Sequence, residues 1–248
     1  MEDVNGELTA PDFDGTLIVG TSGPDELFGT PGDDLIVGLG GDDDIYGSHG
    51  NDVICGGPGV DVIDGENGDD ALYGDDQADW LIGGNNNDLL YGGAGNDDLE
   101  GNNGEDLLYG EGGADVLLAG NGQDEVYGGE GADYLEGNNG NDLLDGGAGV
   151  DQLYGGTGND TLAGGAGNDE LYGENGSDDL DGGDDDDYCL GGNGNNAIAN
   201  CETPVSVTSS AVNGLTSLQV YRLNDLTPAD AIRGQFLDIY LPVVAALQ

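Results

Sequence analysis

The sequence predicts an all-β solenoid, a stack of about ten coils of 18 residues followed by a small C-terminal segment of different character. Three observations predict this fold. A nine-residue repeat runs from Gly20 to Ala199 without insertion or deletion, its key residues keep fixed positions, and alternate repeats differ from each other. Such short, unbroken periods are typical of solenoids, in which each repeat buries its apolar side by stacking on its neighbours.

The columns of the repeat define a turn and a short strand. When each repeat is numbered from 1 to 9, starting at Gly20, position 1 is glycine in nineteen of twenty repeats and position 4 in seventeen. Position 6 is aspartate in nineteen repeats, except at Asn196, and position 8 is aliphatic in nineteen, except at Cys189. Glycine permits a tight turn, and in a strand over positions 7 to 9 the middle residue points inward.

A coil contains two repeats, because alternate repeats carry different residues. Position 3 is asparagine in seven repeats of one set of ten and in none of the other set. Position 9 of the first set gives a run of tyrosines 18 residues apart: Tyr73, Tyr91, Tyr109 and Tyr127. At about 4.8 Å between stacked strands, ten coils make a rod roughly 48 Å long.

The charge of the chain requires cations. Acidic residues number 52 against two basic ones, which gives a formal net charge of −50. Self-repulsion of this size opposes any compact state unless cations neutralise it. Nucleic acid is excluded as a partner, as are anionic membrane surfaces, because the basic residues are limited to Arg222 and Arg233. Membrane insertion is not expected either, since no run of about 18 apolar residues occurs.

The repeat resembles that of the RTX (repeats-in-toxin) calcium-binding family, whose pattern is GGxGxDxUx. Clean copies are GGAGNDDLE at 92–100 and GGTGNDTLA at 155–163, and the resemblance covers about 180 of the 248 residues. It implies a right-handed parallel β-roll in which calcium ions lie between successive turns, held by position-6 carboxylates and carbonyl groups of the glycine turns. It also implies export by type I secretion and folding outside the cell.

The expected calcium ligands are the position-6 aspartates. They are Asp25, Asp34, Asp43, Asp52, Asp61, Asp70, Asp79, Asp88, Asp97, Asp106, Asp115, Asp124, Asp133, Asp142, Asp151, Asp160, Asp169, Asp178 and Asp187. Four repeats depart from the pattern, through Gln77, Asn86 and Asp185 in place of the position-4 glycine and Asn196 in place of the last aspartate. We expect these sites to be the weakest, and the last one above all.

Calcium suits this set of oxygen ligands, whereas one histidine and three cysteines cannot provide a series of zinc sites. Two stacks of ten turns have up to about eighteen spaces between turns, and eighteen calcium ions would nearly balance the 43 carboxylates between Gly20 and Ala199. The alternative, a solvated acidic surface, gives no reason to keep aspartate in one column. Binding restricted to the folded state should drive folding, with weak sites of about 10⁻⁴–10⁻³ M.

The two ends of the chain differ from the array. Residues 1–19 are interpreted as a first coil or N-terminal cap, in which residues 11–19 keep the strand and lose the glycine turn. Residues 200–248 predict a hairpin with a turn at Asn213 and Gly214, then a helix that begins near Thr227. This segment is either a cap over the open edge of the solenoid or a C-terminal secretion signal. The N-terminal residues lack the pattern of a cleaved signal peptide, so a signal for export is expected either to lie elsewhere or to have been removed.

The cysteines are expected to have structural roles. Cys189 occupies a core column and Cys201 lies just beyond the last repeat, so a disulfide between them would hold the last coil in an oxidising compartment. Cys55 is predicted to be an inert thiol, because no basic neighbour is present to lower its pKa.

No enzyme is predicted. The sequence has no HExxH, GxSxG or phosphate-binding loop, and His49 is its single histidine. The leading hypothesis is a secreted, calcium-binding structural or cell-surface protein that folds on calcium outside the cell. The first alternative is a homo-oligomer or extracellular filament. It would assemble through open strand edges or through the face that carries the position-9 tyrosines, called the tyrosine face below. An ice-binding protein is the second alternative, suggested by the asparagine column.

The tyrosine face is an outward stripe of apolar and aromatic residues at positions 7 and 9. Its members are Ala71, Tyr73, Leu89, Tyr91, Leu107, Tyr109, Tyr127 and Leu143. Either these tyrosines stabilise the sheet by packing as a ladder, or the stripe is covered by the C-terminal segment or by another copy of the protein.

Overall fold

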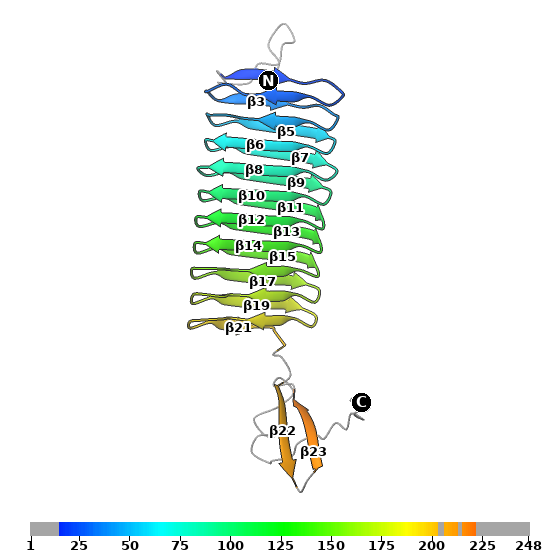
Figure 1. Cartoon of the computed structure of the whole chain (residues 1–248), viewed down its shortest axis with the longest axis vertical. Coiled ribbons are helices and arrows are strands. Elements are labelled where there is room, and N and C mark those ends of the chain that lie inside the picture. The colour runs from blue at the N-terminus through cyan, green and yellow to red at the C-terminus, as the bar shows by residue number, and fades with distance from the viewer. Residues whose placement is uncertain (1–14, 203–205, 213–214, 222–248) are drawn as a thin grey trace, which may run out of the picture. The chain divides into compact units, whose positions relative to one another are not determined.

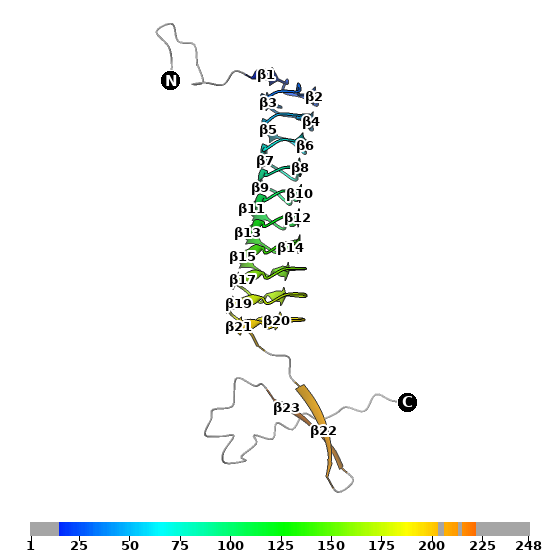
Figure 2. The same cartoon turned by 90° about the vertical axis from the view of Figure 1, so that its left-hand side faces the viewer.

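The computed structural model describes residues 15–202, 206–212 and 215–221. The chain divides into two parts, Met1–Asn200 and Cys201–Gln248. The described residues of the first part form a β-solenoid of two parallel sheets, one on each side of the stack (Figure 1 and Figure 2). The residues that the structure describes contain no helix of the length and apolar character needed to cross a membrane.

The odd-numbered strands from β1 to β21 form one eleven-stranded sheet in chain order. Their bounds are β1 (Thr16–Val19), β3 (Asp34–Val37), β5 (Val53–Pro58), β7 (Ala71–Asp76), β9 (Leu89–Ala94), β11 (Leu107–Gly113), β13 (Glu125–Gly131), β15 (Leu143–Gly149), β17 (Thr161–Ala166), β19 (Asp179–Asp184) and β21 (Ala197–Ala199). The even-numbered strands form the second, ten-stranded sheet. Their bounds are β2 (Glu26–Phe28), β4 (Asp44–Tyr46), β6 (Val62–Asn67), β8 (Trp80–Asn85), β10 (Asp98–Asn103), β12 (Val116–Asn121), β14 (Tyr134–Asn139), β16 (Gln152–Tyr154), β18 (Glu170–Tyr172) and β20 (Tyr188–Leu190).

The register confirms the predicted 18-residue coil. Leu99 pairs with Leu81 on one side and Leu117 on the other, in parallel strands. Each coil therefore places its position-8 residue directly over that of the next coil. β1 pairs with β3 in the same register, so residues 16–19 continue the stack as the sequence predicts.

The core is a thin column of position-8 side chains. These are completely or almost completely buried from Ile36 to Leu180. Burial of a leucine or isoleucine side chain stabilises a fold by about 1.5–3 kcal/mol, so the column favours the stacked state. At the ends the column opens, since Ile18 and Leu27 are only half-buried and Ile198 is 48% exposed.

Side-chain ladders run along the outside of the stack. The predicted tyrosine ladder is present, with ring centroids 5.2, 4.8 and 5.0 Å apart from Tyr73 to Tyr127. The tyrosine rings are half-buried in this stack. A second tyrosine ladder, which the repeat pattern did not predict, lies on the other sheet and includes Tyr154 and Tyr172 with ring centroids 4.8 Å apart. That the C-terminal segment or another copy of the protein covers the tyrosine face stays a prediction.

The asparagine column at position 3 also forms a ladder. The Asn103 amide donates to Asn85 Oδ1 at 3.2 Å, and the Asn121 amide donates to Asn103 Oδ1 at 3.0 Å. Position-5 asparagines are used within the fold as well, since Asn87 Oδ1 accepts the Glu105 N–H at 2.8 Å. These bonds favour a structural role for both columns over a role in binding ice.

The second part contains the predicted hairpin. β22 (Ser206–Val212) pairs with β23 (Leu215–Tyr221) in antiparallel register, with Val212 opposite Leu215. The predicted turn at Asn213 and Gly214 and the predicted helix near Thr227 lie outside the described residues.

The cysteines follow the prediction. Cys189 and Cys201 are both disulfide-bonded, and Cys55 is free. Burial and the nearby Asp75 carboxylate raise the pKa of the Cys55 thiol, which lowers its thiolate fraction and its reactivity.

Candidate metal centres

The position-6 aspartates lie inside the turns. Their side chains are at most 3% exposed from Asp34 to Asp187, while Asp25 in the first repeat is half-buried. One carboxylate oxygen, Oδ1, accepts the backbone N–H of the position-6 residue one coil earlier. Asp106 Oδ1 accepts the Asp88 N–H at 2.8 Å, and Asp124 Oδ1 accepts the Asp106 N–H at 2.8 Å. The aspartates therefore form a continuous ladder that joins successive coils.

The second carboxylate oxygen, Oδ2, is buried without a hydrogen-bond partner in seventeen of these aspartates. They are Asp43, Asp52, Asp61, Asp70, Asp79, Asp88, Asp97, Asp106, Asp115, Asp124, Asp133, Asp142, Asp151, Asp160, Asp169, Asp178 and Asp187. A buried charged oxygen without a partner is strongly unfavourable, and carboxylates in this position are normally paired or bound to metal. Each of these turns therefore has, at the same place, a buried carboxylate oxygen that lacks a partner.

The position-1 glycines explain what surrounds Oδ2. A Cβ atom added to Gly110 would lie 2.5 Å from Asp115 Oδ2 and 2.6 Å from the carbonyl oxygen of Gly128 in the next coil. At Gly137 the corresponding distances, to Asp142 Oδ2 and the Gly155 carbonyl oxygen, are 2.6 and 2.7 Å. The absence of a side chain thus lets a carboxylate oxygen and a carbonyl oxygen approach the same point beside the glycine. Both are hard ligands of the kind that calcium prefers.

Backbone carbonyls must provide most of the ligands. Within the described ranges, no three His, Cys, Asp or Glu side chains converge to hold a metal ion. Calcium needs six to eight oxygen ligands, which a single position-6 carboxylate cannot provide alone. This donor set fits calcium and matches the ligands that the family resemblance implies.

The three repeats that lack the position-4 glycine keep the same geometry. Gln77, Asn86 and Asp185 adopt the left-handed conformation with φ of 82°, 81° and 80°. The aspartates of these repeats are buried and retain an unpartnered Oδ2 like the other turns. The positions of these carboxylates therefore give no reason for the three sites to be weaker than the others.

The last repeat is different. Asn196 Oδ1 accepts the Asp178 N–H at 2.8 Å and so continues the ladder. Its amide nitrogen then occupies the place beside Gly191 where other repeats have Oδ2. An amide NH₂ group is a donor and cannot bind a cation. This supports the expectation that the last site is the weakest.

The first two repeats also differ, because Asp25 and Asp34 have partners for Oδ2. Asp25 Oδ2 accepts the Thr21 N–H at 2.5 Å, and Asp34 Oδ2 accepts the Thr30 N–H at 2.5 Å. Hydrogen bonds from Thr30 and Thr16 outweigh the effect of burial, so the pKa of Asp34 lies below its usual value.

Burial raises the pKa of the mid-array carboxyl groups. For Asp106 it does so to about 7, although the hydrogen bond from Asp88 acts in the opposite direction, and the charge of Asp124 raises the value further. The pKa of Asp88 is raised to about 8, again chiefly by burial. Without cations, the folded array would therefore hold protons on many of these groups at neutral pH.

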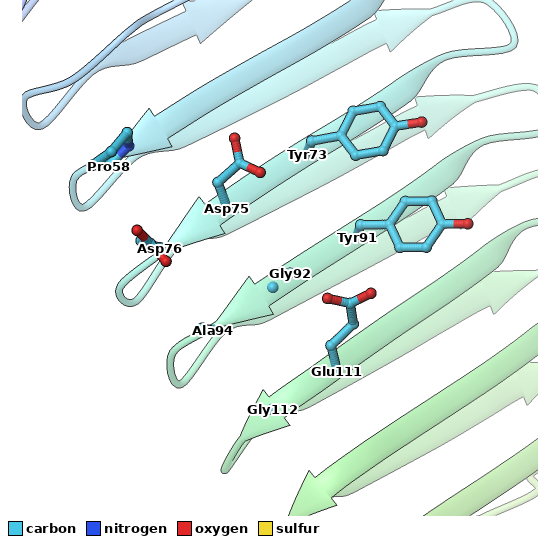
Figure 3. Close-up of a pocket in the computed structure, with 10 residues that line it drawn as sticks. Pro58, Tyr73, Asp75, Asp76, Tyr91, Gly92, Ala94, Glu111 and Gly112 are labelled. Carbon is cyan, nitrogen blue, oxygen red and sulfur yellow. The ribbon is translucent and has the colours of Figure 1, made fainter.

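A groove on the outer face of the odd-numbered sheet contains a separate set of carboxylates (Figure 3). Asp75 and Glu111 lie at position 2, two coils apart, and Gly93 occupies position 2 of the coil between them. Tyr73 and Tyr91 form one side of the groove. These acidic groups face outward and take no part in the buried aspartate ladder.

The close approach of these oxygens to the position-1 glycine predicts a sharp difference between two neighbouring substitutions. Gly110→Ala should destabilise the folded protein by about 1–3 kcal/mol, the usual cost of overpacking, because the new methyl group would meet Asp115 Oδ2 and the Gly128 carbonyl. Gly112→Ala is the matched control, since its nearest contact would be 3.9 Å away. Urea unfolding of both variants at saturating calcium checks this, and equal midpoints would contradict it.

The repeat array matches a known family. Five consecutive stretches fit the sequence model of the family described as RTX calcium-binding nonapeptide repeat (4 copies), at residues 19–54, 56–90, 91–126, 127–162 and 163–198. Together these stretches cover most of the chain. No individual curated protein matched the chain in a sequence comparison.

Proposed function

Since the chain belongs to the family of RTX calcium-binding nonapeptide-repeat proteins, we propose that it is a secreted structural protein that folds on calcium outside the cell. That it is a calcium-binding repeat protein with a β-roll fold follows from the family and the stacked parallel coils. The finer proposal rests mainly on the seventeen buried Oδ2 atoms without partners. They make the folded state dependent on a bound cation.

The residues have distinct roles in this proposal. Position-6 Oδ1 atoms join the coils through backbone N–H groups, as in the pair Asp88 and Asp106. The Oδ2 atoms and the carbonyl groups of position 1 would hold calcium, which supplies positive charge and accepts irregular oxygen coordination. Glycine at position 1 lets these two oxygens come close together. The ladder thereby becomes stable only when its negative charge is neutralised.

An extracellular or cell-surface location is supported by two considerations. Extracellular calcium modules typically have weak sites of about 10⁻⁴–10⁻³ M, so they are filled outside the cell and empty in the cytosol. The disulfide-bonded cysteines Cys189 and Cys201 are typical of an oxidising compartment. Secretion before calcium binding would keep the chain unfolded during export.

We propose a non-catalytic role. The residues that line the outer groove are tyrosines, glycines, Pro58, Ala94 and acidic residues. None of these side chains is a histidine, a cysteine, a serine or a lysine. The carboxylates of Asp75, Asp76 and Glu111 are exposed on the outer surface.

Self-assembly into a filament is the second candidate, and the ends of the stack favour it. The apolar side chains of Leu17 and Phe28 are 61% and 59% exposed at one end, and that of Ile198 is 48% exposed at the other. The outermost strands β1 and β21 each pair on one side within the described residues. Electron microscopy with and without calcium separates the two candidates: filaments at millimolar calcium support assembly, and single rods support a monomeric structural protein.

A substitution at mid-array tests the proposed function. Asp106→Asn keeps the Oδ1 acceptor, as Asn196 does naturally, and replaces Oδ2 with a donor. Loss of one site should lower stability by about 2.7 kcal/mol when calcium is present at a hundred times its dissociation constant. The matched control is Asp25→Asn, in a repeat whose Oδ2 already accepts hydrogen bonds from Thr21.

The measurement is urea unfolding of both variants at several calcium concentrations. The Asp106→Asn deficit should grow as calcium rises, while that of Asp25→Asn should stay constant. A deficit for Asp106→Asn that does not depend on calcium would count against the proposed function.

A further inference from the structure

The turns fall into two conformational classes that depend on position 2. In the eighteen repeats from the one that starts at Gly38 onward, the position-2 residue has a positive φ between 64° and 113°. Ten of these residues are glycines, and the other eight include Leu39, Ser48 and Asn102. In the first two repeats position 2 is Thr21 and Thr30, and neither has a positive φ.

The branched side chain of threonine accounts for this division. A β-branched residue is strongly disfavoured at positive φ, whereas asparagine and unbranched residues tolerate the left-handed region. Ser48 provides the internal comparison, because it carries a hydroxyl group without the branch and adopts a φ of 87°. The branch, and not the hydroxyl group, therefore excludes the left-handed turn.

The position-6 carboxylate has different hydrogen-bond partners in the two classes of turn. In the threonine turns, the position-2 N–H donates to Oδ2 of Asp25 or Asp34 at 2.5 Å. The Thr21 hydroxyl adds a bond to Asp25 Oδ2 at 2.9 Å, and the Thr30 hydroxyl donates to Asp34 Oδ1 at 3.1 Å. In the left-handed turns from Asp43 to Asp187, Oδ2 is buried and has no such partner.

We propose that position 2 decides whether a turn accepts calcium, and that threonine closes a turn against the ion. A carboxylate oxygen that accepts N–H and O–H groups directs its lone pairs at these hydrogens, which occupy the place of a cation. Asp25 and Asp34, expected as ligands from the sequence pattern, then bind no calcium, and the occupied array begins at Asp43. This inference rests on the proposed function, since it concerns which turns bind the proposed ion.

The consequence is an N-terminal coil that closes without metal. Its aspartates have the hydrogen bonds that the later repeats lack, so the first coil should remain ordered at calcium concentrations that leave the later turns empty. The last repeat reaches a similar state by different means, because Asn196 places an amide donor where Oδ2 would lie.

A gain of sites tests the proposal most sharply. The double variant Thr21→Gly/Thr30→Gly should adopt the left-handed turn in both repeats and carry two more calcium ions than the natural sequence at saturation. The matched control is Thr21→Val/Thr30→Val, which keeps the branch and loses the hydroxyl groups, and it should carry an unchanged number. Native mass spectrometry over a calcium titration counts the ions, since each adds a discrete mass to a protein of 25.0 kDa.

A substitution in the opposite direction tests the proposal even if the glycine variant fails to fold. Leu39→Thr should close the turn of Asp43 and remove one ion, while Leu39→Asn, which tolerates positive φ, should remove none. Equal ion counts for the natural sequence, Thr21→Gly/Thr30→Gly and Leu39→Thr would overturn the inference while leaving the proposed function intact. A natural protein that binds no calcium at all would overturn both.

Discussion

Removal of calcium is expected to unfold the β-roll. In excess EGTA, the far-UV circular dichroism spectrum should change from that of β-structure to that of an unfolded chain. The radius of gyration should rise toward about 55 Å, the value for an unfolded chain of this length. The reason is electrostatic: 43 carboxylates lie between Gly20 and Ala199 with no lysine or arginine among them, and seventeen of their buried oxygen atoms lack a partner. Burial of apolar side chains in a core that holds one position-8 residue from each sheet per coil does not offset this repulsion.

The control is the return of calcium to the same sample, which should restore the β spectrum. Magnesium at equal concentration should not restore it, because magnesium demands near-ideal octahedral geometry and retains its water ligands. A β spectrum that persists unchanged in EGTA would contradict the role of calcium in folding.

Acid is expected to replace calcium. Burial raises the pKa of Asp106 to about 7 and that of Asp88 to about 8, against about 3.9 for an unfolded chain. A group whose pKa is higher in the folded state stabilises that state fully below its unfolded pKa, and this contribution is lost as the pH rises through the folded pKa. The calcium-free chain should therefore gain β-structure near pH 4 and lose it between about pH 6 and 8.

With calcium present the direction reverses. Protons compete with calcium for the same carboxylate oxygens, so the calcium-loaded protein should lose stability as the pH falls. Circular dichroism of a resin-treated, calcium-free sample and of a calcium-saturated sample, each from pH 4 to 8, would show the two opposite slopes. Parallel slopes would mean that the buried aspartates do not control stability.

The sequence predicts most of this fold, because the constant columns of the repeat correspond to physical requirements. Position 8 builds the core, position 1 allows the carboxylate to approach the backbone closely, and the difference between alternate repeats defines the coil. The register of Leu99 with Leu117 follows directly from the 18-residue period. The hairpin at Ser206–Val212 and Leu215–Tyr221 follows from its alternating pattern and Asn-Gly turn.

The differences between repeats were harder to predict, because they depend on columns that vary. Threonine at position 2 is unremarkable in sequence, yet it separates the turns of Asp25 and Asp34 from the rest. The second tyrosine ladder was missed because Tyr134 and Tyr188 lie at position 7 whereas Tyr154 lies at position 9. The threonine turns and the second tyrosine ladder do not follow from the consensus of the repeat, because each depends on which side chains the stacked coils bring together.

The role of Oδ1 also lay beyond the sequence. An aspartate column indicates a ligand, but it does not reveal that one oxygen of each carboxylate accepts an N–H group from the coil before it, as Asp106 does from Asp88. Oδ2 is then the oxygen without a protein partner in the buried aspartates. The same bond explains why Asn196, whose Oδ1 accepts the Asp178 N–H, preserves the ladder.

The most direct test of the central claim is a crystal structure of the calcium-saturated protein with anomalous diffraction data that locate each calcium ion. We expect a row of ions in each stack of turns, each in contact with the Oδ2 atom of a position-6 aspartate, from Asp43 to Asp187, and none at Asp25 or Asp34. An ordered β-roll in which these Oδ2 atoms contact only water or protein, with calcium confined to the outer surface, would contradict the account.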